Sequence, residues 1–214
     1  MRAKMEEVTY DEMLEMASLG AKVLHSRCVE IAKKYGVELL VCSSLNRNSG
    51  TMVREKTKME KMLISGVAAD KNVAKIRVAG LGNDPESTFR LLNLLDRNNL
   101  NIDVMIQSLG KDGTKSVSFT VAKPDMLRTI DVLNDNKDSL GIKKLDYDEN
   151  VAKISVIGAG VRSHSGVAAK MFGALANAGI NTEMITTSEI RITALIDEAY
   201  ADQAMRAIHE TFLE

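Results

Sequence analysis

The sequence predicts an α+β fold made of two βαββαβ units, with the first unit inserted into the second. Three observations carry this prediction. The segment that starts at Asn72 (NVAKIRVAGLG) returns with few changes at Asn150 (NVAKISVIGAG), an offset of 150 − 72 = 78 residues, and such internal repeats indicate a duplicated unit. The strand that starts at Asn101 likewise matches the one at Asn181, an offset of 181 − 101 = 80 residues. The second copy has no sixth element, whereas a spare strand precedes the first copy.

Two helices and two strands are expected ahead of the repeats. Apolar residues at helical spacing predict helices at Tyr10–Ala21 and Ser26–Tyr35, and Gly36 supplies a C-terminal cap for the second helix. Apolar runs predict strands at Val37–Ser43 and Met62–Val67. The alternately charged stretch Thr51–Lys61 follows a turn cluster, so we expect it to be exposed and to mark a domain boundary.

The first repeat has the element order βαββαβ, which is the split-βαβ arrangement with antiparallel strands and helices on one face. Pro85 stands where a helix starts, and the residues 110–113 (GKDG) predict a hairpin turn. The predicted elements are strand Val73–Val78, helix Ser87–Asn98, strand Ile102–Ser108, strand Ser116–Val121, helix Pro124–Asn134 and strand Ile142–Tyr147.

The second repeat follows the same order but stops after five elements. They are strand Val151–Ile157, helix Val167–Ala178, strand Thr182–Thr187, strand Ile190–Ile196 and helix Ala201–Phe212. An unpaired sheet edge at the missing position would be open to aggregation. We therefore expect the spare strand Met62–Val67 to fill that position. The two additional residues of this copy fall in its loop, near His164 and Ser165.

The composition excludes several classes of function. Among 214 residues 27% are charged, with a net charge of −1, so there is no electrostatic basis for binding nucleic acid or an anionic membrane. No apolar run approaches the length of about 20 residues that a membrane span needs, and the first residues contain no signal-peptide segment. We therefore expect a cytoplasmic protein, with Cys28 and Cys42 as reduced core thiols. Hydrophobic residues make up 45% but aromatic ones only 4%, which predicts an aliphatic, Met-rich core.

No arrangement of residues predicts catalysis. The glycines of Gly158–Gly160 resemble the start of a dinucleotide-binding fingerprint, but Ser163 replaces its third glycine and the element order is wrong for that fold. The three histidines, at positions 25, 164 and 209, lie far apart without other metal ligands at a suitable spacing, so we interpret them as surface or loop residues. No nucleophile is accompanied by an obvious base.

The residues do suit the binding of a small zwitterion. In each repeat a glycine-containing loop, Gly82–Thr88 or Gly160–Ala168, leads into the N-terminus of a helix. The unpaired amides and the dipole of such an end favour a carboxylate. Polar side chains follow on the next strand of each copy and could bind an ammonium group: Asn101, Asp103 and Gln107, and Asn181, Glu183, Ser188 and Glu189. The alternative is that these side chains only satisfy turns or are solvated.

The paired units and their loops resemble ACT domains, and the chain as a whole resembles the C-terminal part of aspartokinase. Nearly the full length takes part in this resemblance. The segments that carry it are Tyr10–Arg27, Ile64–Ala68, Gly160–Phe172 and Ile185–Ile192.

The resemblance implies a division into three parts. Residues 1–58 would be the C-terminal remnant of the amino-acid-kinase domain. Residues 59–70 with 148–214 would form the second ACT domain, and residues 71–147 the first, both of the ferredoxin-like type.

Aspartokinases transfer phosphate from ATP to the side-chain carboxylate of L-aspartate, the step that opens the biosynthesis of lysine, threonine and methionine. The catalytic lobe of the family begins with a KFGGTS-type motif, which this sequence lacks. The resemblance therefore implies no activity for this chain alone and no cofactor of its own, since ATP and magnesium would belong to the missing lobe. The chain would be a separately translated regulatory subunit or a fragment of a longer protein.

The resemblance also implies partners and an effector site. The family binds lysine or threonine where the first ACT domain of one chain meets the second ACT domain of another, so we expect a homodimer that acts on a catalytic subunit or kinase domain. By position, the first unit would supply Asn83, Asp84, Pro85, Glu86, Ser87, Thr88, Asn101, Ile102, Asp103 and Gln107. The partner would supply Val167, Ala168, Asn181, Thr182, Ser188 and Glu189.

One departure from the family's pattern implies that effector binding at the first loop is weakened or altered in specificity. Aspartokinases usually have the sequence Asp-x-Pro-Gly-x-Ala there, whereas this chain places Glu86 at the glycine position and shifts the acid by one residue, to Asp84. A side chain then stands where the backbone should approach a ligand. Ser165 replaces a proline in the second loop, which is a milder change. A ligand-free dimerisation module is the alternative function.

A third alternative is a nucleic-acid-binding sheet, since such domains stack bases on exposed aromatic residues. The central strands offer only Phe119 for this purpose, so we rank it last.

Overall fold

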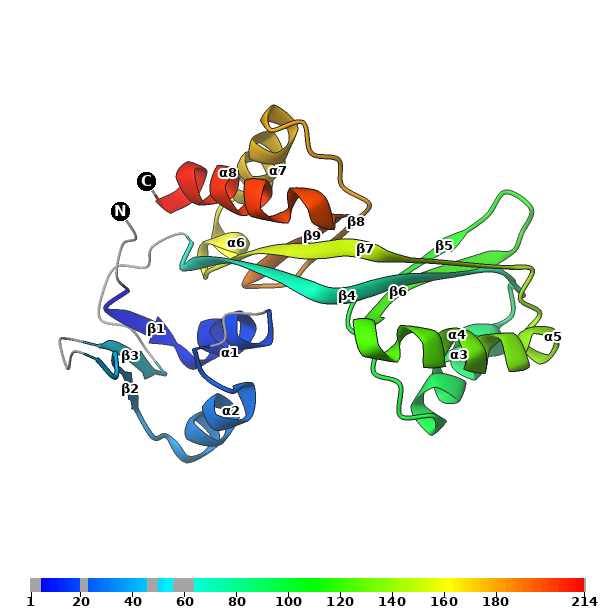
Figure 1. The fold of residues 1–214 in the computed structure, drawn as a ribbon, viewed down its shortest axis with the longest axis horizontal. Coiled ribbons are helices and arrows are strands. Elements are labelled where there is room, and N and C mark those ends of the chain that lie inside the picture. Colours follow the sequence, from blue (N-terminus) through cyan, green and yellow to red (C-terminus); the bar gives the residue numbers. More distant parts are fainter. Residues whose placement is uncertain (1–4, 20–22, 46–49, 56–63, 214) are drawn as a thin grey trace. The chain divides into compact units, whose positions relative to one another are not determined.

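The computed structural model describes residues 5–19, 23–45, 50–55 and 64–213 (Figure 1). The chain forms two compact units. One contains Met1–Asp70 together with Lys153–Glu214 and is called the discontinuous unit below; the other, Lys71–Ala152, is called the inserted unit. The predicted insertion of the first repeat within the second is therefore part of the fold.

The inserted unit has the predicted βαββαβ order. Its strands lie in the sheet order β5-β6-β4-β7, and β6 is antiparallel to both β4 and β5. The predicted hairpin turn closes through the Gly110 amide, which donates to the Thr114 carbonyl (2.8 Å). The elements are β4 (Gly66–Leu81), α3 (Pro85–Arg97), β5 (Met105–Leu109), β6 (Lys115–Ala122), the short helix Lys123–Asp125, α4 (Met126–Asp135), α5 (Lys137–Leu140) and β7 (Lys144–Ile157).

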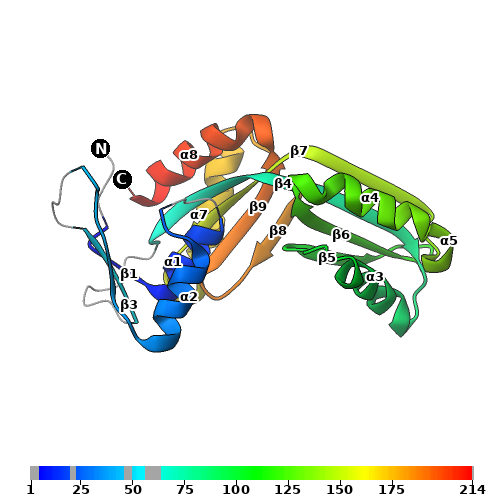
Figure 2. The ribbon, with the colours of Figure 1, turned by 60° about the horizontal axis from the view of Figure 1, so that its bottom comes forward.

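Two helices, α3 and α4, cover one face of this sheet (Figures 1 and 2). Alternate residues of β4 and β6, such as Ile76 and Phe119, pack with Leu91 and Leu95 of α3 and Leu133 of α4, and all five are at most 2% exposed. Each such side chain contributes about 1.5–3 kcal/mol through burial. Because Phe119 is fully buried against the helices, it is not available for stacking with a base.

The second repeat completes its sheet with the spare strand. In the discontinuous unit the sheet order is β4-β7-β9-β8, so the start of β4 lies beside β7, where the sixth element belongs. Met62 and Leu63 of the predicted spare strand lie outside the described residues. The further elements are α6 (Gly160–Ser163), α7 (Gly166–Asn177), β8 (Met184–Thr187), β9 (Arg191–Asp197), the short helix Glu198–Tyr200 and α8 (Ala201–Leu213).

Two long strands replace four predicted ones. β4 joins the predicted strands Met62–Val67 and Val73–Val78, and β7 joins Ile142–Tyr147 and Val151–Ile157. The prediction of breaks was wrong because the polar residues 70–72 and 148–150 were read as interruptions. Asp70 and Asp148 are partly buried and the others exposed. A strand can carry polar side chains on a face that meets water, and the Asp70 carboxylate pairs with Lys153 (3.1 Å). Both strands contribute residues to both units.

The N-terminal part of the discontinuous unit contains a small three-stranded sheet beside two helices. β3 is central in the order β1-β3-β2, parallel to β1 and antiparallel to β2. Gly36 caps α2 in the left-handed conformation (φ 65°), as predicted. The elements are β1 (Glu7–Thr9), α1 (Tyr10–Ser18), α2 (Ser26–Tyr35), β2 (Leu39–Val41) and β3 (Thr51–Arg54).

The prediction that Thr51–Lys61 is exposed was wrong in its first four residues. They form β3, in which Val53 is fully buried and the Arg54 guanidinium pairs with the Glu7 carboxylate. The two apolar residues Met52 and Val53 are too short a run to stand out beside the charged residues that follow. Residues 56–61 lie outside the described residues.

α1 packs against the strands of the second repeat. Tyr10, Met13 and Met16 belong to a buried cluster that also contains Ala68 of β4 and Ile157 of β7. A Cβ added at Gly66 would lie 3.0 Å from the Met16 sulfur, so the helix approaches β4 closely. Thr9 and Glu12 form a capping box at the start of α1, which fixes where the helix begins.

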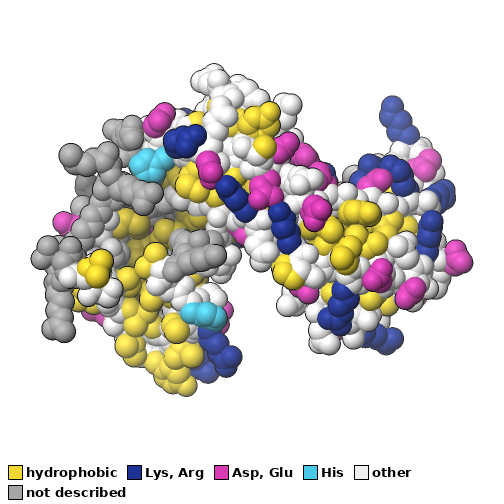
Figure 3. Space-filling view, viewed as in Figure 1, with side chains coloured by type: hydrophobic (Ala, Val, Ile, Leu, Met, Phe, Trp, Pro, Cys, Tyr) yellow, Lys and Arg dark blue, Asp and Glu magenta, His cyan; other side chains and the backbone are white. Residues whose placement is uncertain are grey.

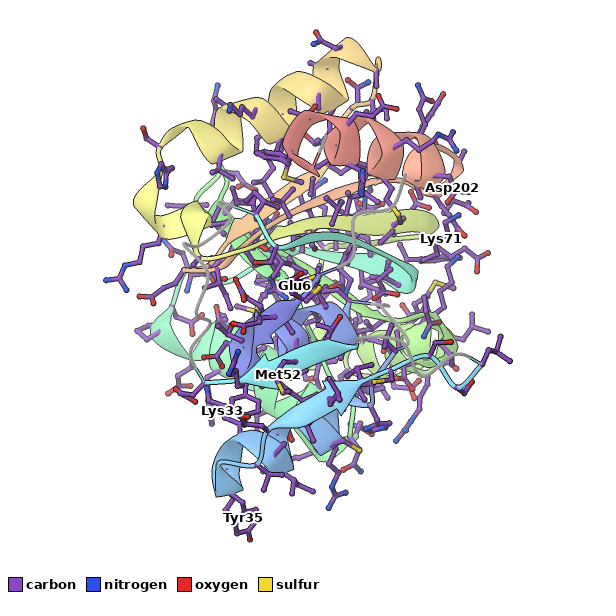
Figure 4. All side chains as sticks on the ribbon, turned by 90° about the vertical axis from the view of Figure 1, so that its left-hand side faces the viewer. Glu6, Lys33, Tyr35, Met52, Lys71 and Asp202 are labelled. Atoms are coloured by element: carbon purple, nitrogen blue, oxygen red, sulfur yellow. The ribbon has the colours of Figure 1, made fainter. Side chains whose placement is uncertain are left out.

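The surface of α2 and β2 is unusually apolar (Figure 3). Ile31, Val37 and Leu40 are at least half exposed, and Tyr35, at 70% exposure, projects from the end of α2 (Figure 4). Cys28 and Cys42 are also exposed, so the prediction of core thiols was wrong; helix α2 instead buries Val29 and Ala32. No described helix has the length and apolar character to cross a bilayer.

Candidate effector-binding loops

The first loop is closed by its own acid. Asp84 is the N-cap of α3, and its Oδ1 accepts hydrogen bonds from the amides of Glu86 and Ser87, both at 2.9 Å. The Ser87 hydroxyl donates to Oδ2 of the same carboxylate. Two of the amides that were expected to meet a ligand therefore already serve an internal carboxylate. Gly82 allows this arrangement, since a Cβ there would lie 2.5 Å from the Asp84 Oδ2.

These contacts stabilise the charged form of Asp84. The hydrogen bond from Ser87, followed by the bonds from the amides, holds the pKa of Asp84 below its usual value of 3.8, although desolvation opposes the shift. The Lys115 ammonium donates to the Asp84 carbonyl (2.7 Å), and Arg90 lies 3.6 Å from the carboxylate. The first loop is thus a satisfied, anionic helix cap.

The remaining first-repeat residues divide between the two ends of α3. The Thr88 hydroxyl donates to the Gln107 side-chain oxygen (2.6 Å), so these two lie together beside the loop. Asn101, Ile102 and Asp103 instead follow the C-terminal end of the helix, and a helix of 13 residues spans about 20 Å. Ile102 is partly buried against the core, and the Asp103 amide donates to the Thr120 carbonyl (3.1 Å).

The second loop is built differently. It contains the short helix α6, which we did not predict, and Ser165 follows as the N-cap of α7 in a helical conformation (φ −59°, ψ −18°). The Ser165 side chain makes no capping hydrogen bond to the amides of α7. Gly166 is exposed, and a Cβ built on it meets no atom within 4 Å. The start of α7 is therefore open in front of its first turn.

Val167 and Ala168 form this first turn. Val167 is buried, and its amide makes a long hydrogen bond of 3.3 Å to the His164 carbonyl. Of the predicted residues on the second repeat, these two present backbone and small side chains rather than polar groups.

Asn181 and Thr182 lie at the other end of α7. Together with Phe172, Leu175 and Ile180 they line an open hollow of about 350 Å³. This end of a helix carries a partial negative charge, so the hollow suits an ammonium or apolar group better than a carboxylate.

Ser188 and Glu189 form the turn between β8 and β9. The Ser188 amide donates to the Arg191 carbonyl (2.7 Å), and the Glu189 carboxylate accepts from Arg162 of α6 (3.0 Å). This ion pair ties the turn to the open loop, although both side chains are more than 70% exposed. The sequence did not point to Arg162 or Lys115, because each acts through a partner distant in the chain. Within the described residues no group of His, Cys, Asp and Glu side chains could hold a metal ion.

The comparison with family models identifies the class of protein. A model of the ACT domain matches residues 154–212, which cover the second repeat as far as its last helix. Because the first repeat has the same element order as the matched second repeat, the chain is a protein with two ACT-type domains.

Relatives of known identity specify the family. The chain is 40% identical to an aspartokinase of Pseudomonas aeruginosa over 98% of its own length. It shares 42% identity with a chain in a crystal structure of aspartokinase alpha and beta subunits (TM-score 0.66, 70% of this chain and 98% of that chain). It also shares 33% identity with the ligand-free regulatory subunit of aspartate kinase from Thermus thermophilus (TM-score 0.66, 70% and 99%). The chain belongs to the aspartokinase family, in the part that holds its ACT domains.

The similarity differs in coverage and in sequence identity from one relative to another. The chain spans only 52% of the length of the Pseudomonas relative. An Escherichia coli aspartokinase III in complex with lysine and aspartate shares the fold at a TM-score of 0.79, but with 24% identity.

Proposed function

We propose that this chain is the regulatory portion of an aspartokinase, which converts ATP and L-aspartate to 4-phospho-L-aspartate. In this proposal it binds an end-product amino acid, lysine or threonine, and pairs with a second copy through its ACT domains in the cytoplasm. Effector binding would act on a kinase domain or catalytic subunit through a difference in affinity between two states. The observation that carries the proposal is the uncapped N-terminus of α7.

The α7 end suits the carboxylate of an amino acid. The Val167 amide of its first turn makes only a long bond to the His164 carbonyl (3.3 Å), the dipole adds positive potential, and the space beside Gly166 is open. The Ser188–Glu189 turn lies close by, held through Arg162, and its side chains can accept from an ammonium group. Residues of the first repeat, above all Gln107 beside Thr88, would complete the site from the partner chain.

The domain boundaries remain part of this proposal. Residues 1–58 would belong to the kinase domain, residues 59–70 with 148–214 to the second ACT domain, and residues 71–147 to the first. ATP and magnesium would be bound by a lobe outside this chain, so a kinase assay on the chain alone should show no turnover.

Titration calorimetry with lysine and threonine, singly and together, tests the proposal. We expect heat with at least one of the two, and light scattering should give the mass of a dimer. A dimer that gives no heat with either amino acid would contradict effector binding and leave the dimerisation role.

The second candidate is a ligand-free dimerisation module, and the internal cap of the first loop favours it. In that case the Asp84 carboxylate would stand where the effector carboxylate once bound. The variant Glu86→Gly restores the residue that the family resemblance predicts at this position. If wild type gives no heat but this variant does, the second candidate is correct.

A further inference from the structure

The β8–β9 turn is connected to α1 by two short routes, although the two are far apart in the sequence. Ser188 and Glu189 of this turn belong to the proposed effector site. Helix α1 belongs to the N-terminal part of the chain, which is the kinase portion in the proposed function. All of these residues lie within the discontinuous unit.

The first route is an ion pair. Arg191 closes the turn, because its carbonyl accepts from the Ser188 amide (2.7 Å). Its guanidinium donates to the Glu15 carboxylate of α1 at 2.8 Å, and the two side chains are only 20% and 26% exposed. Partial burial reduces screening by salt, so this pair is stronger than one on the open surface.

The second route runs through the backbone of the second repeat. The Ile190 carbonyl of the turn accepts from the Gly158 amide (2.9 Å), and the neighbouring Ile157 carbonyl accepts from the Ser65 amide (2.7 Å). The Ser65 hydroxyl then donates to the Glu12 carboxylate of α1 (2.6 Å).

Glu12 is the fixed end of this route. It is only 7% exposed, and its other oxygen accepts from the amide and the hydroxyl of Thr9 at the N-cap of α1. Removing one of these hydrogen-bond donors would leave a buried carboxylate oxygen without its partner, which is destabilising. Because Glu12 and Glu15 are three residues apart, both routes end on one face of α1.

We propose that Arg191–Glu15 and Ser65–Glu12 form the relay that couples the effector turn to the kinase portion. A shift of the turn on effector binding would move Arg191 and the Ile190 carbonyl together, and α1 would follow. Met16 packs closely on Gly66, so the start of β4 also contacts α1 directly. This relay rests on the proposed function, since it needs an effector at the turn.

Hydrogen exchange of the α1 amides, with and without lysine or threonine, tests the relay. In wild type we expect the effector to change α1 protection by about fivefold or more. Glu15→Gln removes the first route and should reduce this change while the binding heat remains. Asp11→Asn is the matched control, because Asp11 lies on the same helix but pairs with Lys33 of α2 (2.5 Å), and this variant should keep the change.

The outcomes separate the relay from the proposed function. If calorimetry shows binding but Glu15→Gln leaves the effector-induced change in α1 undiminished, the relay is wrong and the proposed function stands. If wild type binds neither amino acid, the relay and the proposed effector binding are both wrong. A double-mutant cycle of Glu15→Gln and Arg191→Gln on unfolding needs no effector: non-additive effects support the connection, and additive effects overturn it.

Discussion

The two repeats differ in how the N-terminus of their first helix is capped. In the inserted unit the helix start is closed by Asp84, which binds two amides and a hydroxyl. In the discontinuous unit the corresponding Ser165 caps no amide of α7. One copy thus caps its helix with its own N-cap side chain, whereas the other does not. A duplicated fold preserves the position of a loop but not its hydrogen bonds.

The largest loss of stability is expected from core substitutions, and it should be similar in the two repeats. The helix that follows each loop buries an equivalent leucine. Leu95 of α3 and Leu175 of α7 are equivalent at the offset of 80 residues and are 2% and 1% exposed. Changing either to Ala should cost about 2–5 kcal/mol through lost burial and a cavity. Urea unfolding measures both, and a cost confined to one helix would show that the copies differ in more than their loops.

Substitutions of the N-cap residues should lower stability by less than the core substitutions, and by different amounts in the two repeats. Asp84→Ala removes the acceptor of two amides and should lower stability measurably, but by less than Leu95→Ala. Ser165→Ala should change stability little, because that side chain caps nothing in α7. Thermal unfolding of the two variants provides the comparison, and equal losses would refute the difference between the loops.

The contribution of Asp84 should also depend on pH. Its pKa is lowered in the folded protein, so the carboxylate stabilises the fold above its usual value of 3.8 and ceases to do so as pH falls through the lowered folded value. The difference in unfolding midpoint between wild type and Asp84→Asn should therefore be present at neutral pH and shrink in strong acid. A difference that grows on acidification would contradict the assigned hydrogen bonds.

The smallest effect on stability is expected at Gly166. Alanine fits there, since a Cβ meets no atom within 4 Å, and it favours a helix over glycine. The added methyl would nevertheless stand in the open space before the helix. Gly173→Ala, at an exposed position further along α7 with equal room, is the matched control. Circular dichroism should show both variants to be at least as stable as wild type.

The internal repeat made the fold predictable from the sequence, and short elements that the repeat pattern does not indicate were missed. The element order and the role of the spare strand came from the offset between Asn72 and Asn150. Strand β3 was missed because its four residues precede a charged stretch, and α6 because it begins at Gly160, a residue typical of loops.

The sequence indicates which polar residues lie near the loops but not which hydrogen bonds they make. Asp84 directly before Pro85 is a local signal for a helix N-cap, but the sequence does not show that the Gly82 position leaves the room its carboxylate needs. The exposure of Cys28 depends on which face of α2 packs inward, and α2 buries Val29 and Ala32 instead.

The central claim is that the uncapped start of α7 binds the carboxylate of an amino acid. Calorimetric titration of lysine and threonine into wild type, Gly166→Ala and Gly173→Ala tests it most directly. The account predicts heat with wild type, clearly weaker binding with Gly166→Ala and unchanged binding with Gly173→Ala. Equal affinity in all three proteins, or no heat from wild type, would contradict it.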